Sequence, residues 1–211
     1  MKLHSYVVVT DSGFAPNPFW GYCTLATCKP VIRRCAKAGD WIVGTGSKNG
    51  AGQGMLVYAM RVDEVLSIER YATDSRFEEK KPRVGSPETL CGDNIYSKDE
   101  SGVWRQHPLS YHGDKDMRRD LSGKNVLISK NFYYFGGNAV EILEDYRSLV
   151  PSGRGHRNKH NLEIVREFIQ WLRTSFSVGA PGKPANFQRK SQQNKFLQPT
   201  ARSLPVINPA W

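Results

Sequence analysis

Residues 39–54 read Gly-Asp-Trp-Ile-Val-Gly-Thr-Gly-Ser-Lys-Asn-Gly-Ala-Gly-Gln-Gly, and this stretch decides the fold. It opens with a turn and the apolar strand 41–44, and a long strand at residues 55–65 follows it. Because the glycine-rich part runs into a strand rather than a helix, it lacks the helix N-terminus on which phosphate-binding loops depend. The stretch therefore predicts two antiparallel strands joined by a loop whose glycines let the backbone approach a flat ligand closely.

The rest of the chain supplies further strands and two main helices. Strands are predicted at residues 5–10 and 126–129, where β-branched or apolar residues run together. A short helix is predicted at residues 27–38, with Thr27 as its N-cap. The strongest helix is predicted at residues 161–176, because its apolar residues recur at helical spacing; they are Leu162, Val165, Phe168, Ile169, Leu172 and Phe176.

Composition divides the chain of 211 residues into a domain and a tail. Within the domain, residues 83–125 are rich in Gly, Ser, Asp and Pro and are predicted to be extended and partly β. Residues 179–211 carry five cationic residues and no acidic one, so we predict a domain at 1–178 and a flexible basic tail at 179–211. The formal net charge of +10 favours a polyanionic partner such as nucleic acid.

The four cysteines do not indicate a disulfide scaffold. Cys23, Cys28, Cys35 and Cys91 form no Cys-x-x-Cys pair, and three of them have apolar neighbours, where a free cysteine acts as a small hydrophobic residue. No run approaches the ~18 apolar residues that a membrane-spanning helix needs. We therefore expect a cytoplasmic protein with no membrane partner.

No residue pattern identifies catalytic chemistry. The five histidines show no metal-ligand spacing with a cysteine or a carboxylate, so neither a metal nor another cofactor is predicted. His107 and His112 are interpreted as surface or hydrogen-bonded loop residues. The sequence shows no Ser-His-Asp order and no carboxylate pair from which a nucleophile could be identified. It therefore leaves open whether the protein is an enzyme.

Aromatic residues gather in two segments. Residues 14–22 hold four rings in a loop stiffened by two prolines, and residues 132–135 are aromatic throughout. Rings held in a rigid loop can stack on nucleobases, at ~1–3 kcal/mol per base; the alternative is that they complete the core. Asp93, Asn94 and Tyr96 form either a turn with its own side-chain bonds or a group that reads the edge of a base.

Several motifs together resemble the nucleotide modification associated domain 2 family. They are Phe14-Ala-Pro-Asn-Pro-Phe-Trp-Gly-Tyr-Cys-Thr-Leu-Ala-Thr-Cys-Lys-Pro30, Ile32-Arg-Arg34, Gly39-Asp-Trp-Ile-Val-Gly-Thr-Gly-Ser47, Gly92-Asp-Asn-Ile-Tyr96 and Phe132-Tyr-Tyr-Phe-Gly136. The resemblance covers roughly residues 5–175, and its N-terminal motif is long and specific. It implies a role near DNA-modification and phage-related systems, but no particular reaction.

A second resemblance concerns the fold. The order of helix, Gly-Asp strand, glycine-containing loop and long strand, followed by Tyr71-x-x-Asp74-x-Arg76-Phe77, is similar to PUA-like domains of the EVE, ASCH and YTH kind. This resemblance implies a mixed α/β fold with a PUA-like curved or closed β-barrel flanked by helices. EVE and YTH members read a modified base in an aromatic-lined pocket, although fold alone does not fix function.

Two functional hypotheses follow. The first is a module that binds nucleic acid or a nucleotide and recognises a modified base, with DNA as the preferred polymer. The alternative is an enzyme that modifies or hydrolyses a nucleotide or a base. The pocket is predicted where loop 14–22 meets residues 45–48. Its predicted residues are Phe14, Asn17, Trp20, Tyr22, Thr45, Ser47 and Lys48, with Asp93, Asn94 and Tyr96 on the opposite wall.

Overall fold

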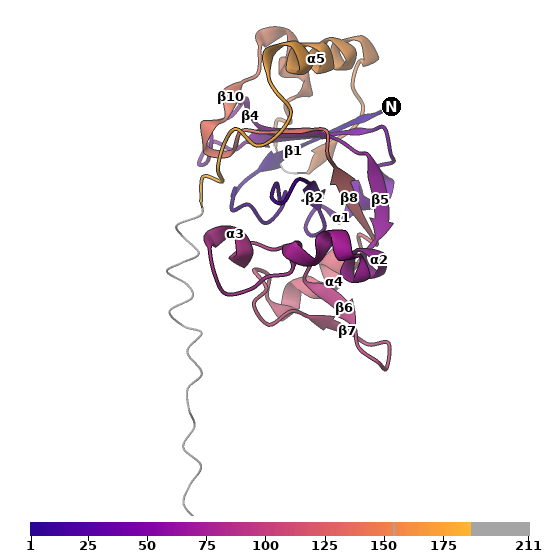
Figure 1. Cartoon of the computed structure of the whole chain (residues 1–211). Helices are drawn as coiled ribbons and strands as arrows, with labels where there is room; N and C mark the ends of the chain where they lie inside the picture. Colours follow the sequence, from indigo (N-terminus) through magenta and orange to yellow (C-terminus); the bar gives the residue numbers. More distant parts are fainter. Residues whose placement is uncertain (154, 187–211) are drawn as a thin grey trace, which may run out of the picture.

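The computed structural model describes residues 1–153 and 155–186, whose strands form three sheets (Figure 1). The largest has the order β10-β4-β3-β1-β11, and β9 also pairs with β4. Its strands are β1 (Leu3–Val8), β3 (Trp41–Gly46), β4 (Met55–Arg61), β9 (Phe132–Tyr134), β10 (Val140–Glu141) and β11 (His156–Arg157). The second sheet has the order β2-β8-β5 and the third pairs β6 with β7; their strands are β2 (Cys23–Leu25), β8 (Asn125–Ser129), β5 (Glu64–Ser67), β6 (Tyr96–Lys98) and β7 (Trp104–Gln106).

Helices cover the outer faces of the two larger sheets. The α-helices are α1 (Pro30–Cys35), α2 (Ile68–Thr73), α3 (Pro87–Leu90), α4 (Asp114–Leu121) and α5 (Leu162–Ser175), and the 3-10 helices are η1 (Ser75–Lys80), η2 (Gly136–Asn138) and η3 (Glu144–Leu149). Figure 1 shows α5 above the largest sheet, with α2 and α4 on the far side of the second sheet. No helix within the described residues is long and apolar enough to cross a membrane.

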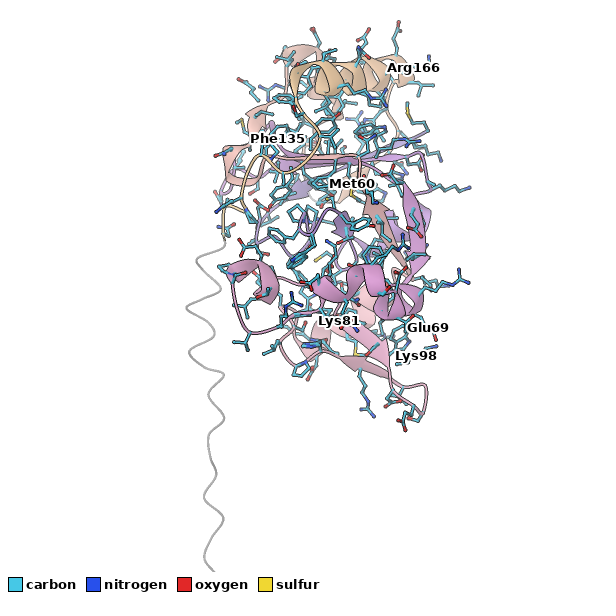
Figure 2. The ribbon with its side chains drawn as sticks, in the orientation of Figure 1. Met60, Glu69, Lys81, Lys98, Phe135 and Arg166 are labelled. Carbon is cyan, nitrogen blue, oxygen red and sulfur yellow. The ribbon has the colours of Figure 1, made fainter. Side chains whose placement is uncertain are left out.

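Three hydrophobic clusters hold these layers together. One lies between the two larger sheets and includes Tyr6, Met60 and Leu127. A second joins α5 to the opposite face of the largest sheet, and a third packs α2 and η1 against β8. Figure 2 shows Met60 well inside the molecule and Arg166 on the outer face of α5, as the apolar periodicity of that helix requires.

The mixed α/β class and several elements agree with the sequence prediction. The strands β3 and β4 are antiparallel, and the side chain of Asn161 accepts a hydrogen bond from the Glu163 amide at the start of α5. No sheet among the described residues closes into a barrel, so the closed PUA-like barrel is not confirmed.

Three predicted elements differ from the structure. The prediction of a single strand at 55–65 is wrong. The chain turns after Arg61, and the residues that follow form β5 in the second sheet. At this turn the Asp63 carboxylate accepts a hydrogen bond from the amide of Lys130. The helix 27–38 is shorter, because the residues before Pro30 are left-handed and Ala36 is extended. Residues 83–125, predicted to be extended and partly β, also contain the helices α3 and α4. Because α4 is mostly charged, its sequence has no apolar periodicity from which a helix could be predicted.

The chain after α5 returns to the largest sheet. The amide of Gly179 donates to the Phe132 carbonyl, and the Tyr134 amide donates to the Gly179 carbonyl. Farther on, the amide of Ala185 donates to Asp11 Oδ2 at 3.0 Å. Packing therefore continues from residue 179 to residue 186, beyond the boundary predicted at 178, and the rest of the predicted tail, 187–211, lies outside the described residues.

Candidate functional site

Two hollows adjoin each other near the end of β1. The larger, which we call the lysine cavity, has a volume of about 770 Å³ and includes Lys29, Ser47 and Lys48 in its lining. The smaller, which we call the cysteine cavity, has a volume of about 260 Å³ and is lined in part by Phe14, Cys28, Lys29, Tyr111 and His112. Val7, Val9 and Lys29 line both cavities, so the two cavities lie next to each other.

The turn before α1 presents Cys28 to the cysteine cavity. Cys28 and Lys29 have φ angles of 56° and 37°, in the left-handed region that residues other than glycine rarely adopt. Hydrogen bonds hold this turn on both sides: the Cys28 amide donates to Asp120 Oδ1 at 2.9 Å, and Arg33 Nε donates to the Cys28 carbonyl at 2.8 Å. Such local strain persists only where the surrounding structure fixes it, which is common at functional sites.

Cys28, His112 and Asp120 form a continuous chain of polar contacts. Cys28 Sγ lies 3.5 Å from His112 Nε2. The other ring nitrogen, Nδ1, donates to Asp120 Oδ2 at 2.5 Å. The hydroxyl of Tyr96 also donates to Asp120 Oδ2, at 2.9 Å. Asp120 is fully buried and so orients both the histidine ring and the cysteine turn.

The charges of this chain favour a protonated histidine. Burial lowers the pKa of His112, but the hydrogen bonds with Asp120 and Cys28 outweigh that effect and raise the pKa to about 9. Burial raises the pKa of Asp120, yet the hydrogen bond and the charge of His112 bring it below its ordinary value. At neutral pH the site therefore holds an imidazolium between a carboxylate and a sulfur atom.

This geometry is that of a thiol nucleophile with its base and an orienting carboxylate. The three potential ligand atoms also lie within 4.8 Å of one another, as a metal site would require. However, Asp120 and Cys28 contact opposite nitrogens of the same ring, and a histidine ligates a metal ion through one nitrogen. The arrangement therefore suits proton transfer between sulfur and imidazole better than joint coordination of one ion.

Some of the sequence-predicted residues line the two cavities. Phe14 lies in the cysteine cavity, with its ring centroid 4.8 Å from that of His112. Ser47 and Lys48 line the lysine cavity. Tyr96 contacts the site through Asp120, and the buried Thr45 hydroxyl donates to the Tyr6 carbonyl at 3.4 Å.

The remaining predicted residues surround the buried Lys80 instead. The Lys80 ammonium donates to Asn17 Oδ1 at 2.7 Å and to the Tyr22 carbonyl at 3.0 Å, and it lies 5.7 Å from the ring centroid of Trp20. Burial lowers the pKa of Lys80 to about 8. Asn17 is fully buried here, so these contacts hold the proline-rich loop in place.

Asp93 and Asn94 are also engaged in internal bonds. Asp93 is buried and accepts hydrogen bonds from the hydroxyls of Thr24 and Tyr71, each at 2.7 Å. The Asn94 side-chain amide donates to the carbonyls of Tyr71 and Phe77. A role for either residue in reading a base stays a prediction. In the structure, internal hydrogen bonds already engage both side chains.

Sequence reasoning missed the three residues of the polar chain. The sequence predicts a surface or hydrogen-bonded loop position for His112, which agrees with its contacts, but no pattern points to a chemical role for Cys28, His112 or Asp120. One local signal was present: Cys28 immediately precedes Lys29 and Pro30, where a helix begins. The other two residues lie on a distant loop and a charged helix, so their proximity to Cys28 could not be read from spacing.

The raised pKa of His112 predicts that the free energy of unfolding depends on pH. From its ordinary value of 6.5 to about 9, the shift corresponds to a stabilisation on the order of 3 kcal/mol. Because the folded pKa is raised, this contribution is complete below pH 6.5 and disappears as the pH rises through 9. In urea unfolding, we expect the difference in unfolding free energy between the wild type and His112→Gln to shrink from pH 6 to pH 9.5. A difference that does not change with pH would contradict the ion pair between His112 and Asp120.

Comparison of the sequence with known proteins places the chain in a family. The family described as nucleotide modification associated domain 2 matches residues 1–191, a wider span than the motifs alone indicated. No curated protein and no solved structure matches the chain. The resemblance based on the N-terminal motif is thus confirmed, and the chain belongs to the nucleotide modification associated domain 2 family.

Proposed function

We propose that the protein is an enzyme that uses Cys28 as a nucleophile on a carbonyl group of a nucleotide or a modified base. The single observation that carries this proposal is the contact chain from Cys28 through His112 to the buried Asp120, at the wall of a cavity. A core cysteine needs no histidine beside it and no carboxylate behind that histidine. The proposal selects the enzyme from the two functional hypotheses that the sequence left open.

In the proposed reaction the Cys28 sulfur is the nucleophile and His112 carries the proton. The Cys28 thiolate attacks the carbonyl carbon, so that a C–S bond forms and the π electrons move to the carbonyl oxygen. When this adduct collapses, the bond to the leaving group breaks and His112 Nε2 gives the leaving group its proton. Neutral His112 then takes a proton from water, whose oxygen displaces the sulfur; the products are an acid and the released group, and the ion pair is restored.

The family supports the choice of substrate class. Its description concerns nucleotide modification, and carbonyl groups occur on nucleobases and on the substituents that enlarge them. The exposed ring of Tyr111, which lies beside His112 and packs on the buried Phe14, offers aromatic surface to a planar base. A nucleotide whose base carries an amide or an ester is therefore the substrate that the site suits best.

Alkylation with iodoacetamide tests the state of Cys28 without knowledge of the substrate. Cys35 is exposed and serves as a reference in the same molecule, whereas Cys23 and Cys91 are buried. Because an adjacent imidazolium stabilises a thiolate, we expect Cys28 to react about tenfold faster than Cys35 at pH 6.5, as measured by peptide mass mapping. The excess should disappear in His112→Gln, and equal rates for Cys28 and Cys35 in the wild type would sink the proposal.

A module that recognises a modified base without chemistry is the second candidate. It is favoured by the aromatic rings and the two lysines of the adjoining cavities. A PUA-like relationship, DNA as the polymer and a phage-related context belong to this candidate and rest on resemblance. Mass spectrometry of modified and unmodified oligonucleotides and nucleotides, after incubation with the protein, separates the two: a mass change indicates the enzyme, and retention without change indicates the reader.

A further inference from the structure

We propose, on the basis of the proposed function, that the substrate carries a phosphate group that Lys29 and Lys48 hold in the lysine cavity. The ligand is thus a nucleotide unit rather than a free base or a nucleoside. Its phosphate occupies the lysine cavity while its base reaches Cys28 in the adjoining cysteine cavity.

The first support is the position of Lys29. It follows Cys28 in the chain and lines both cavities, so one side chain links the nucleophile to the larger hollow. Its ammonium lies 3.4 Å from the Val7 carbonyl and 4.4 Å from the ring centroid of Tyr6. These neutral contacts place the charge near the cavity wall but do not neutralise it.

The second support is the balance of charge in the lysine cavity. Among its described lining residues are two lysines and no acidic residue. Neither lysine forms a salt bridge with a described carboxylate, whereas Lys81 and Lys98 pair with Glu78 and Glu69; Figure 2 shows the latter pair side by side. Burial already lowers the pKa of Lys29, so a bound anion would relieve an unfavourable charge.

The third support is the size and the remaining chemistry of the lysine cavity. Its volume of about 770 Å³ lies within the ~300–1,000 Å³ that is typical of small-ligand sites. The neutral polar residues Ser47, Asn49 and Gln53 share the lining with the lysines. Donors and acceptors of this kind suit the hydroxyl groups of a sugar, which joins the phosphate to the base.

Binding measurements on the full chain test this inference. Calorimetry would compare deoxycytidine, deoxycytidine 5′-monophosphate, inorganic phosphate and a single-stranded oligonucleotide. We expect the monophosphate to bind at least tenfold more tightly than the nucleoside, and Lys29→Gln or Lys48→Gln to remove most of that difference. Lys37→Gln, which changes an exposed lysine after α1, should leave it intact. A preference for the oligonucleotide over the monophosphate would identify the phosphate as that of a strand.

A protection experiment links the two cavities. The monophosphate should slow the alkylation of Cys28 by iodoacetamide and leave that of Cys35 unchanged. Equal affinity for nucleoside and monophosphate, or full affinity in Lys29→Gln, would overturn the phosphate site even if Cys28 is reactive. Conversely, lysine-dependent binding of the monophosphate with an unreactive Cys28 would leave the phosphate site standing and remove the proposed catalysis.

Discussion

Cys28→Ala is expected to lower the rate of any mass change in a nucleotide substrate by at least ~10³-fold. The mechanism makes the sulfur atom form the covalent intermediate, and alanine has no atom that could replace it; loss of a nucleophile from such an arrangement removes most of the catalysis. The rate would be measured by mass spectrometry on the substrate that the wild-type protein converts. The wild type should also show a covalent adduct on the peptide that contains Cys28, and the variant should not.

Two controls make this result specific. Cys35→Ala removes an exposed cysteine of α1 and should leave the rate within about twofold of the wild type. Cys28 is only partly buried, so its change to alanine should cost about 1 kcal/mol or less of unfolding free energy. A folded Cys28→Ala protein that converts the substrate at the wild-type rate would refute the assignment of the nucleophile.

The second large effect is expected from Arg33→Lys. The fully buried Arg33 guanidinium donates to the backbone carbonyls of Cys28 and Asn125, each at 2.8 Å, and to that of Asp120. A lysine ammonium is a compact group that cannot match three acceptors placed around a planar fork. Because buried carbonyls would lose their partners, we expect a loss of ~3 kcal/mol in unfolding free energy and a Tm lower by ~6–12 °C.

Arg34→Lys is the matched control for this prediction. Arg34 is the next residue of α1, is exposed, and donates to the Ser122 carbonyl. Its replacement should change the unfolding free energy by less than ~0.5 kcal/mol. Since Arg33 ties the Cys28 turn to the end of α4, Arg33→Lys should also slow the alkylation of Cys28. Equal stability of the two variants would show that Arg33 does not hold the site together.

The sequence by itself determined those features that depend on neighbouring residues. The apolar period of residues 161–176 predicts α5 because the middle of that face, Val165, Phe168, Ile169 and Leu172, is buried against the same sheet. The turn at Gly39-Asp40 and the strands on either side of the glycine-rich loop were likewise predicted from local pattern. Family membership also followed from the sequence, because the long motif at residues 14–30 is specific to the family and needs no structure to be recognised.

Local pattern could not reveal which polar residues meet in space. Asp93 looked like a residue that reads a base, but the fold buries it under the hydroxyls of Thr24 and Tyr71. By contrast, Ser47 and Lys48 were predicted from the glycine-rich loop and do line a cavity, because a loop between two strands stays at the surface. However, the cysteine cavity beside it is lined in part by the turn at Cys28 and Lys29, which is distant from this loop in the sequence.

Only the tertiary structure decided the candidate catalytic site. Cys28 follows β2 and Asp120 precedes β8, and the pairing of these two strands brings the two residues together across a large separation in sequence. Arg33 then fixes the left-handed turn that no propensity at Cys28 favours. The physical reason is that a hydrophobic period reports the burial of its own side chains, whereas a contact between a sulfur, an imidazole and a carboxylate depends on how separate strands pair.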